Sequence, residues 1–130
     1  MTTTDINKNF DDVENPQYYA DTKIEVIDYI EANLDGKLDL EMLAEAVHYS
    51  KYHLHRMFTS TLGMTIHDYV QRRQLTEAAK LLVFSDRPII EVAFICGYES
   101  QQAFSSAFKS MYKIPPAEYR DNREFYPLQL

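Results

Sequence analysis

The stretch Thr65–Phe84, TIHDYVQRRQLTEAAKLLVF, decides the fold. Its apolar residues recur at intervals of three and four with one gap, which is typical of one buried face of a helix. They are Ile66, Tyr69, Val70, Leu75, Ala78, Ala79 and Leu82. The pattern ends before Pro88, because proline cannot continue a helix and restricts the residue before it. We therefore predict a linker helix over 65–84, about 30 Å long at about 1.5 Å per residue.

A short helical pattern occurs on both sides of this helix. The apolar positions of 40–47 recur in 89–96 at an offset of 49 residues, with the spacing i, i+3, i+4, i+7. They are Leu40, Leu43, Ala44 and Val47 in the first copy and Ile89, Val92, Ala93 and Cys96 in the second. Asp39 is the expected N-cap of the first helix, and Pro88 is expected in the first turn of the second. Two unrelated helical hairpins would not match position by position, so the pattern indicates an internal repeat.

A second helix follows each short helix after a tight turn, with Ser50 or Ser100 as its expected N-cap. Its apolar positions match at an offset of 50, so the one-residue difference falls in the turn, where an insertion is tolerated best. They are Leu54, Met57 and Phe58 in one copy and Phe104, Ala107 and Phe108 in the other. Two short helices joined by a tight turn form a helix-turn-helix unit. The sequence therefore predicts an all-α fold with helix-turn-helix units at 39–62 and 87–111.

Polar side chains occupy the outward faces of the two second helices. They are Lys51, Tyr52, His55, Arg56 and Thr59 in the first and Gln101, Gln102, Ser105, Ser106 and Lys109 in the second. In DNA-binding helix-turn-helix proteins this helix enters the major groove, and Arg and Gln pair with guanine and adenine edges through two hydrogen bonds. A merely solvated helix face would more often carry Glu and Lys. DNA readout is the favoured interpretation, and an ordinary polar surface is the alternative.

Four motifs together resemble the DNA-binding domain of the AraC/XylS transcription regulators. They are SKYHLHRMF (50–58), YVQRRQLTEAAKLL (69–82), RPIIEVAFICGYESQQAFSSAFK (87–109) and PPAEYR (115–120). The residues of these motifs are most similar to those of the small stand-alone activators of multiple-antibiotic and oxidative-stress resistance. The resemblance runs from about Thr22 to about Arg123 and implies seven helices. It also implies that one monomer places both recognition helices, about 51–61 and 101–111, in adjacent major-groove segments.

The resemblance also implies roles for single residues, carried over by position. The implied base-contacting residues are Tyr52, His55 and Arg56 in the first unit and Gln101, Gln102 and Ser106 in the second. Three positions depart from the family pattern: members commonly have arginine at Ser106, a basic residue at Thr59 and glycine at Lys113. A residue other than glycine carries a steric cost if the backbone there is left-handed. We therefore expect the second unit to read DNA less stringently than the first.

Basic residues beside the predicted base readers are expected to contact DNA phosphates. Lys51 and Lys109 lie on the outer faces of the recognition helices. Arg73 on the linker helix is a further candidate for a phosphate contact. The alternative for Arg73, and for its neighbour Arg72, is a pair with Glu77 one turn later. The sequence leaves these two roles open.

The net charge of −7 argues against DNA binding. Residues 1–47 contain 12 acids and 3 bases, a charge of −9, whereas residues 48–130 contain 8 acids and 10 bases, a charge of +2. Because a basic patch is the usual footprint of phosphate neutralisation, +2 predicts weaker and more salt-sensitive binding than a strongly basic relative would show. The acidity also favours an alternative function, a helix-turn-helix scaffold that binds protein with weak or no DNA specificity.

The expected organisation is a flexible acidic N-terminal tail (1–17), one domain (18–123) and a C-terminal tail (124–130). The first helix is expected to begin at Asp21 or Thr22. The C-terminal tail is apolar, so it either folds back on the domain or continues into a longer parent protein. The sequence does not separate these alternatives.

Several classes of function lack support. The four histidines have no zinc-type spacing, and neither a nucleophile elbow nor a phosphate-binding glycine loop is present. We expect no metal, no cofactor, no enzyme activity and no identifiable ligand pocket. A single cysteine, with neither a signal peptide pattern nor a long apolar run, predicts a cytoplasmic protein away from membranes. Double-stranded DNA is the expected partner, and RNA polymerase is a candidate protein partner.

Overall fold

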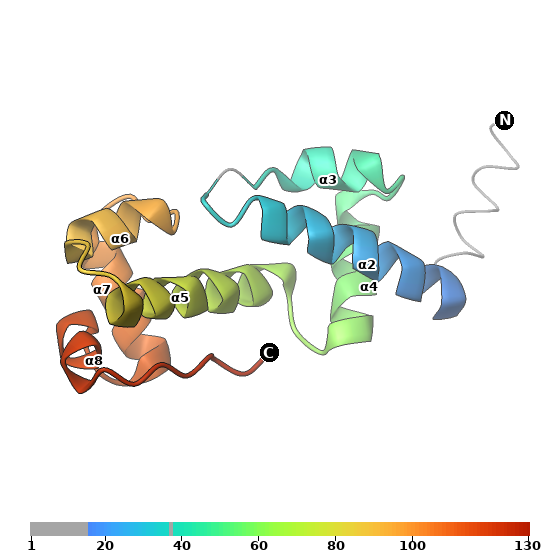
Figure 1. Cartoon of the computed structure of the whole chain (residues 1–130). Helices are drawn as coiled ribbons and strands as arrows, with labels where there is room; N and C mark the ends of the chain where they lie inside the picture. The colour runs from blue at the N-terminus through green and yellow to red at the C-terminus, as the bar shows by residue number, and fades with distance from the viewer. Residues whose placement is uncertain (1–15, 37) are drawn as a thin grey trace, which may run out of the picture. The chain divides into compact units, whose positions relative to one another are not determined.

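The chain is all-α in the computed structural model, which describes residues 16–36 and 38–130 (Figure 1). Seven helices and no strand occur in these residues, which confirms the predicted fold class. The helices are α2 Pro16–Ala32, α3 Leu40–Ala46, α4 Lys51–Leu62, α5 Ile66–Phe84, α6 Ile89–Ile95, α7 Gln101–Tyr112 and α8 Pro116–Asn122. The predicted flexible tail lies outside the described residues as far as residue 15.

The chain divides into two compact units, one around each helix-turn-helix. Unit 1 consists of the residues up to Ala32 together with Asp39–Ile66, and its described helices are α2, α3 and α4. Unit 2 consists of Asn33–Leu38 and His67–Leu130, and it contains α5 from His67 onward, α6, α7 and α8. The segment Asn33–Leu38 therefore belongs to unit 2, although the residues on both sides of it along the chain belong to unit 1.

In unit 1, α2 and α3 both pack against α4. Helix α2 begins at Pro16, not at Asp21 or Thr22, so Pro16 and Gln17 form its first turn instead of belonging to a tail. The physical reason is that proline fits the first turn of a helix, where its missing N–H group would have no partner in any case. Among the side chains of α2 that the structure describes, Val26, Ile30 and Thr22 are buried.

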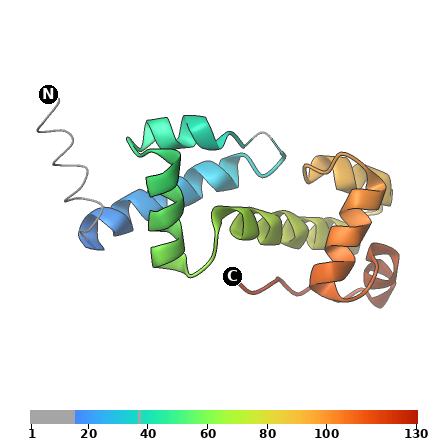
Figure 2. The same cartoon turned by 180° about the vertical axis from the view of Figure 1, so that it is seen from behind.

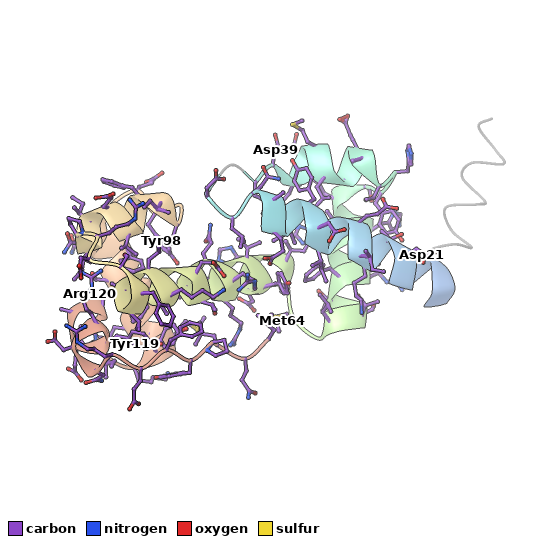
Figure 3. The ribbon with its side chains drawn as sticks, in the orientation of Figure 1. Asp21, Asp39, Met64, Tyr98, Tyr119 and Arg120 are labelled. Atoms are coloured by element: carbon purple, nitrogen blue, oxygen red, sulfur yellow. The ribbon has the colours of Figure 1, made fainter. Side chains whose placement is uncertain are left out.

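Helix α3 begins where the sequence predicts, because the Asp39 carboxylate accepts hydrogen bonds from the amides of Glu41 and Met42 at 3.0 and 3.1 Å. Figure 3 labels Asp39 at the start of this helix. These bonds satisfy two of the four amides that the first turn of a helix leaves without a partner. In the second copy Pro88 is the N-cap residue of α6, which begins at Ile89, one residue later than predicted.

Helix α5 is a core helix of unit 2. Its residues Leu75, Ala78, Ala79 and Leu82 are buried in one cluster with the apolar side chains of α6 and α7. The helix spans Ile66–Phe84, close to the predicted 65–84. The sequence pattern predicts this helix as a linker between the two helix-turn-helix units. The structure shows that most of it is needed to build the second helix-turn-helix.

An aromatic cluster completes the core of unit 2. The ring of Phe108 stacks on Tyr112, with ring centroids 4.5 Å apart, and meets the edge of Tyr119 at 5.3 Å. Tyr98 meets Phe104 edge to face at 5.5 Å. Offset and edge-to-face pairs of this kind each contribute about 0.5–1.5 kcal/mol beyond the burial of their area.

The C-terminal strap, which we define as residues 124–130, is extended and folds back along α5 (Figures 1 and 2). The Tyr126 carbonyl accepts hydrogen bonds from the hydroxyls of Tyr112 and Tyr119 at 2.9 and 3.3 Å, and the Tyr126 amide donates to the Tyr119 hydroxyl at 3.0 Å. The Leu128 amide donates to Thr76 Oγ1 at 3.2 Å. These bonds show that the tail folds back on unit 2.

Helix α8 is tied to the end of α5 by a side chain. Arg120 Nε donates to the Leu82 carbonyl at 2.9 Å, which satisfies a carbonyl in the last turn of α5. Figure 3 labels Arg120 and Tyr119 on α8. Neighbouring residues of one short helix thus hold α5 and the C-terminal strap.

Candidate nucleic-acid interface

The turn between the two helices of each unit has the same backbone hydrogen bonds in both copies. In each turn one amide donates to the carbonyl three residues before it, and the next amide donates to the carbonyl five residues before it. These bonds are His48 N to Glu45 O (3.1 Å) and Tyr49 N to Ala44 O (2.9 Å) in unit 1, and Gly97 N to Phe94 O (3.1 Å) and Tyr98 N to Ala93 O (2.9 Å) in unit 2. The repeat found in the sequence is therefore also a repeat of backbone geometry.

Both recognition helices are capped by serine, as predicted. Ser50 Oγ accepts from the His53 amide at 3.1 Å, and Ser100 Oγ accepts from the Ala103 amide at 3.0 Å. Ser50 directly follows the turn of unit 1, whereas Glu99 separates the turn of unit 2 from Ser100. Glu99 is thus the inserted residue that changes the offset from 49 to 50, and both recognition helices keep the same register after it.

The left-handed backbone positions also match, but they carry different residues. The turn position is His48 in unit 1, with φ 62°, and Gly97 in unit 2, with φ 90°. The residue that ends the recognition helix is Gly63 in unit 1 and Lys113 in unit 2, each with φ 74°. The left-handed geometry is therefore retained at Lys113, where the sequence departs from the family glycine.

The exposed face of α4 carries the residues that the sequence predicts for unit 1. Tyr52 is 67% exposed and Arg56 is exposed, whereas His55 is half-buried. Lys51 Nζ lies 3.6 Å from Glu41 Oε1, and both side chains are largely exposed. An exposed ion pair of this kind contributes little, about 0–1 kcal/mol, so Lys51 can exchange this carboxylate for another anion at small cost.

The exposed face of α7 carries the corresponding residues of unit 2. Gln101, Gln102, Ser106 and Lys109 are exposed, and Ser105 is half-buried. Four residues from the middle of this face to just beyond its C-terminal end line an open hollow of about 540 Å³, which we call the α7 hollow: Ser106, Lys109, Ser110 and Lys113. Sequence reasoning placed Ser106 and Lys109 here but missed Lys113. The spacing 102, 106, 109, 113 was the available signal, since steps of four and three stay on one side of a helix.

Arg73 is the predicted site residue least available to a ligand. Its guanidinium donates to Glu77 Oε2 at 3.1 Å, and its side chain is only 18% exposed. Burial alone would raise the pKa of Glu77, but hydrogen bonds from Lys80 and Arg73 outweigh it, and the pKa is lowered. The structure therefore contains the pair with Glu77 that the sequence left open. Its neighbour Arg72 donates to the Gln129 carbonyl of the C-terminal strap at 3.0 Å.

Neither recognition helix contains an acidic residue. The chain has 20 Asp and Glu, yet α4 and α7, of 12 residues each, carry Lys51, Arg56 and Lys109 and no carboxylate. A solvated surface chosen without regard to a ligand would share the acidity of the rest of the chain. The absence of carboxylates from both helices favours the approach of a polyanion to these faces.

A groove of about 420 Å³ opens elsewhere on unit 2. Its apolar lining comes from Leu34, Leu81, Phe84, Ile95 and Cys96, and its polar lining from Asp35, Gln74, Glu77, Lys80 and Ser85. Burial raises the pKa of the Cys96 thiol to about 12, so this thiol is protonated at neutral pH and is a poor nucleophile. Within residues 16–36 and 38–130, no three His, Cys, Asp or Glu side chains are grouped to hold a metal ion.

None of the helices in the described part of the chain is long and apolar enough to span a membrane.

Comparison with known proteins identifies the family of this helix-turn-helix chain. Residues 43–122 match the family described as Helix-turn-helix domain. The chain is 38% identical over 109 residues to the multiple antibiotic resistance protein MarA of Escherichia coli K12, covering 79% of this chain and 86% of MarA. A transcriptional regulator from Chromobacterium violaceum with an AraC-type DNA-binding domain superimposes with a TM-score of 0.75 at 29% identity, over 80% of this chain and 93% of that one. The chain belongs to the AraC-type helix-turn-helix family.

Two further proteins are similar to this chain. The DNA-binding domain of AdpA, solved in complex with a target DNA, matches with a TM-score of 0.71 at 29% identity, covering 76% of this chain and 89% of that one. The chain is also 37% identical over 103 residues (79% of its length) to YbfP of Bacillus subtilis, an HTH-type transcriptional regulator, but it spans only 35% of YbfP. As an AraC-type protein with both helix-turn-helix units, it is a DNA-binding transcription regulator.

Proposed function

We propose that this AraC-type regulator binds one asymmetric DNA site by inserting α4 and α7 into adjacent major-groove segments. The observation that carries the proposal is the pair of matched recognition helices, each capped by serine after the same turn and each free of carboxylates. A recognition helix reads base edges with the residues of its N-terminal part. The base readers proposed in that part of each helix are exposed, apart from His55, which is half-buried.

Specificity in unit 1 is assigned mainly to Arg56. Its guanidinium can donate two parallel hydrogen bonds to O6 and N7 of guanine, which is the commonest base-specific contact in protein–DNA complexes. Tyr52 and His55 lie on the same helix face and are proposed to contact neighbouring base edges. In unit 2 the amides of Gln101 and Gln102 suit adenine, whose edge presents one donor and one acceptor. Ser106 is proposed as the third base contact there.

Phosphate contacts are assigned to Lys51 and Lys109, which are exposed and lie beside the base readers. Arg73 is ranked below both lysines in this proposal, since a phosphate would have to displace Glu77 from a largely buried guanidinium. Phosphate contacts position a protein on DNA and carry little sequence information by themselves. Replacing either lysine is therefore expected to weaken all duplexes alike.

The second candidate function is a protein-binding module, favoured by two observations. The chain has a net charge of −7, which disfavours a polyanion. In addition, α6 exposes three large apolar side chains, Ile90, Phe94 and Ile95, at 47%, 53% and 39%. Exposed apolar side chains gathered on one helix are typical of protein contact sites.

Activation of transcription in the cytoplasm is the biological setting that we propose. AarP of Providencia stuartii, described as an HTH-type transcriptional activator, is 36% identical to the chain over 104 residues, covering 80% of this chain and 77% of AarP. An activator acts by raising the use of a promoter, so RNA polymerase is the proposed protein partner.

The test begins with selection of bound duplexes from a random pool, followed by titration of the selected duplex at several salt concentrations. Sequence-specific binding predicts an enriched motif and a linear fall of log affinity with log salt. Arg56→Ala should relax the preference at one base pair, at a cost of about 1–3 kcal/mol. Lys51→Ala is the matched control on the same helix, and it should weaken all sequences equally and reduce the salt slope by about 1.

Two outcomes would count against the proposal. If Arg56→Ala weakens all duplexes equally, Arg56 contacts phosphate and the assignment of specificity to it is wrong. If no motif is enriched and the wild-type protein shows no preference over random duplex, the protein-binding alternative replaces DNA readout.

A further inference from the structure

The positive charge on the recognition face is placed differently in the two units. Along the DNA-facing side of α7 the residues are Gln102, Ser106, Lys109 and Lys113, at steps of four, three and four. The last three line the α7 hollow, so they lie on one side of the helix in space as well as in the pattern. The unit 1 residues at an offset of 50 are Tyr52, Arg56, Thr59 and Gly63.

The two units therefore present opposite arrangements. Unit 1 carries its cation, Arg56, in the second position of the stripe, near the N-terminal part of α4. Unit 2 is neutral there, at Ser106, and carries its cations in the third and fourth positions, Lys109 and Lys113. Since the N-terminal part of a recognition helix faces base edges, the C-terminal end is the part that approaches the sugar–phosphate backbone.

Lysine is the side chain that suits this end of the helix. Its ammonium is a compact charge that binds phosphate without a fixed planar geometry, whereas arginine suits the two-bond contact with guanine. Lys113 Nζ donates one hydrogen bond to the Ser110 carbonyl at 3.0 Å. An ammonium has three donors, so Lys113 is held over the α7 hollow and keeps donors for an anion.

The backbone at Lys113 supplies an independent observation. Its φ of 74° is left-handed, and in that region a residue with a Cβ is strained relative to glycine. The equivalent residue of unit 1, Gly63, avoids this cost at the same φ. Strained residues of this kind gather at functional sites, where the surrounding structure holds them in place.

We propose that Lys113 and Lys109 form a phosphate clamp at the C-terminal end of α7, so that unit 2 supplies anchoring while unit 1 supplies most of the base discrimination. The clamp replaces affinity that Ser106 cannot provide at the base-reading position. This inference rests on the proposed entry of α7 into the major groove.

The decisive experiment titrates the duplex selected by the wild-type protein with Lys113→Gly at several salt concentrations. We expect the salt slope to fall by about 1 and the affinity to fall about 3- to 10-fold at moderate salt, equally for specific and random duplexes. The midpoint of thermal unfolding should rise or stay constant, since glycine relieves the left-handed strain. Loss of binding together with unchanged or higher stability cannot come from a damaged fold.

Three further variants test the phosphate clamp. Lys113→Asn removes the charge but tolerates the left-handed backbone, so it should reproduce the binding loss without relying on glycine. Lys80→Ala removes an exposed lysine that is paired with Glu77 on α5, and it should leave the salt slope unchanged. Gly63→Lys places a lysine at the equivalent end of α4, where an added Cβ meets nothing within 4 Å, and it should raise the salt slope by about 1.

An unchanged salt slope in Lys113→Gly, with wild-type binding intact, would overturn the clamp and leave the proposed function standing. A loss confined to one base pair would also overturn it, because Lys113 would then read a base. If the wild-type protein itself selects no duplex, the proposed function fails and the clamp fails with it.

Discussion

Unit 1 and unit 2 build the same turn from different residues. Both turns have the same backbone hydrogen bonds and the same left-handed positions, but glycine stands at one of these positions in each unit and a larger residue at the other. In unit 1 the larger residue is His48, in the turn, and in unit 2 it is Lys113, after the recognition helix. The comparison shows that the hydrogen bonds of the motif fix the backbone, whereas local space decides where glycine is required.

Space is closed at only one of the two glycines. A Cβ added to Gly97 would lie 2.8 Å from Gln74 Nε2 and 3.0 Å from Gly36 Cα, whereas a Cβ on Gly63 would meet nothing within 4 Å. Gln74 is itself held by a hydrogen bond from its Nε2 to the Leu34 carbonyl at 3.1 Å. Gly97 is therefore required by packing, whereas Gly63 is only favoured by its left-handed backbone, which Lys113 adopts without being glycine.

The largest expected effect tests this difference. Gly97→Ala should lower the free energy of unfolding by about 2–4 kcal/mol, because left-handed strain and the clash with the Gly36 backbone add. Gly63→Ala has only the strain and should cost about 1–2 kcal/mol. Chemical denaturation of the two variants gives both values. Equal losses at the two positions would show that Gly36 gives way easily and that packing plays no part.

The next effect concerns the reading faces. Ser106→Arg gives unit 2 the arginine that unit 1 has at Arg56, and it should add about 1–3 kcal/mol of preference for a guanine at the position that Ser106 faces. Selection of duplexes with the variant, compared with the wild type, shows whether one base pair of the motif becomes fixed. An unchanged motif would mean that α7 does not enter the groove at the depth of α4.

A smaller effect on stability comes from the C-terminal strap, which belongs to unit 2 and has no counterpart among the described residues of unit 1. Tyr119→Phe removes the hydroxyl that accepts from the Tyr126 amide and donates to its carbonyl, and it should cost about 1–2 kcal/mol in denaturation experiments. Tyr126→Phe is the matched control, since Tyr126 bonds to the strap's supports through its backbone and should change stability by less than about 0.5 kcal/mol. Similar losses in both variants would assign the effect to the rings instead of the backbone bonds.

The smallest effect is a pH dependence. The pKa of Glu77 is lowered from 4.5, so its ionised form stabilises the folded state above the pKa of the unfolded chain. This contribution is lost as the pH falls through the lower pKa of the folded state. Because the side chain is 36% exposed, Glu77→Gln should cost only about 0.2–1 kcal/mol at pH 7, and the difference from wild type should disappear as the pH falls through the lowered pKa of the folded state. A difference that persists at acidic pH would contradict an ionic origin.

Local rules carried most of the sequence prediction. Helix caps such as Asp39 and Ser50, the turn before Ser100 and the ends of α5 depend on residues close together in the chain, so spacing and residue type were enough. The exposed recognition faces followed from the same periodicity, since whatever is not buried at steps of three and four must face outward. These parts of the site could be placed without coordinates.

The parts that the sequence left open depend on how the chain packs. The C-terminal strap is held by Thr76 and by tyrosine hydroxyls far from it in the chain, and no local pattern marks those partners. The pairing of Arg73 with Glu77 was one of two open alternatives, because exposure decides between them and exposure is set by packing. The steric cost at Lys113 was also predicted only on the condition that its backbone is left-handed, and the sequence alone does not fix that conformation.

The path of the chain has a consequence for dissecting the protein. The chain leaves unit 1 after Ala32, contributes Asn33–Leu38 to unit 2, returns to unit 1 at Asp39 and enters unit 2 again at His67. A single cut between the two helix-turn-helix units would therefore separate Gly97 from Gly36 and Gln74 from its acceptor, the Leu34 carbonyl. A fragment that starts at His67 lacks Asn33–Leu38, which belong to unit 2, so it should fold less stably than the same residues in the whole chain. Each unit should therefore be studied in the intact chain.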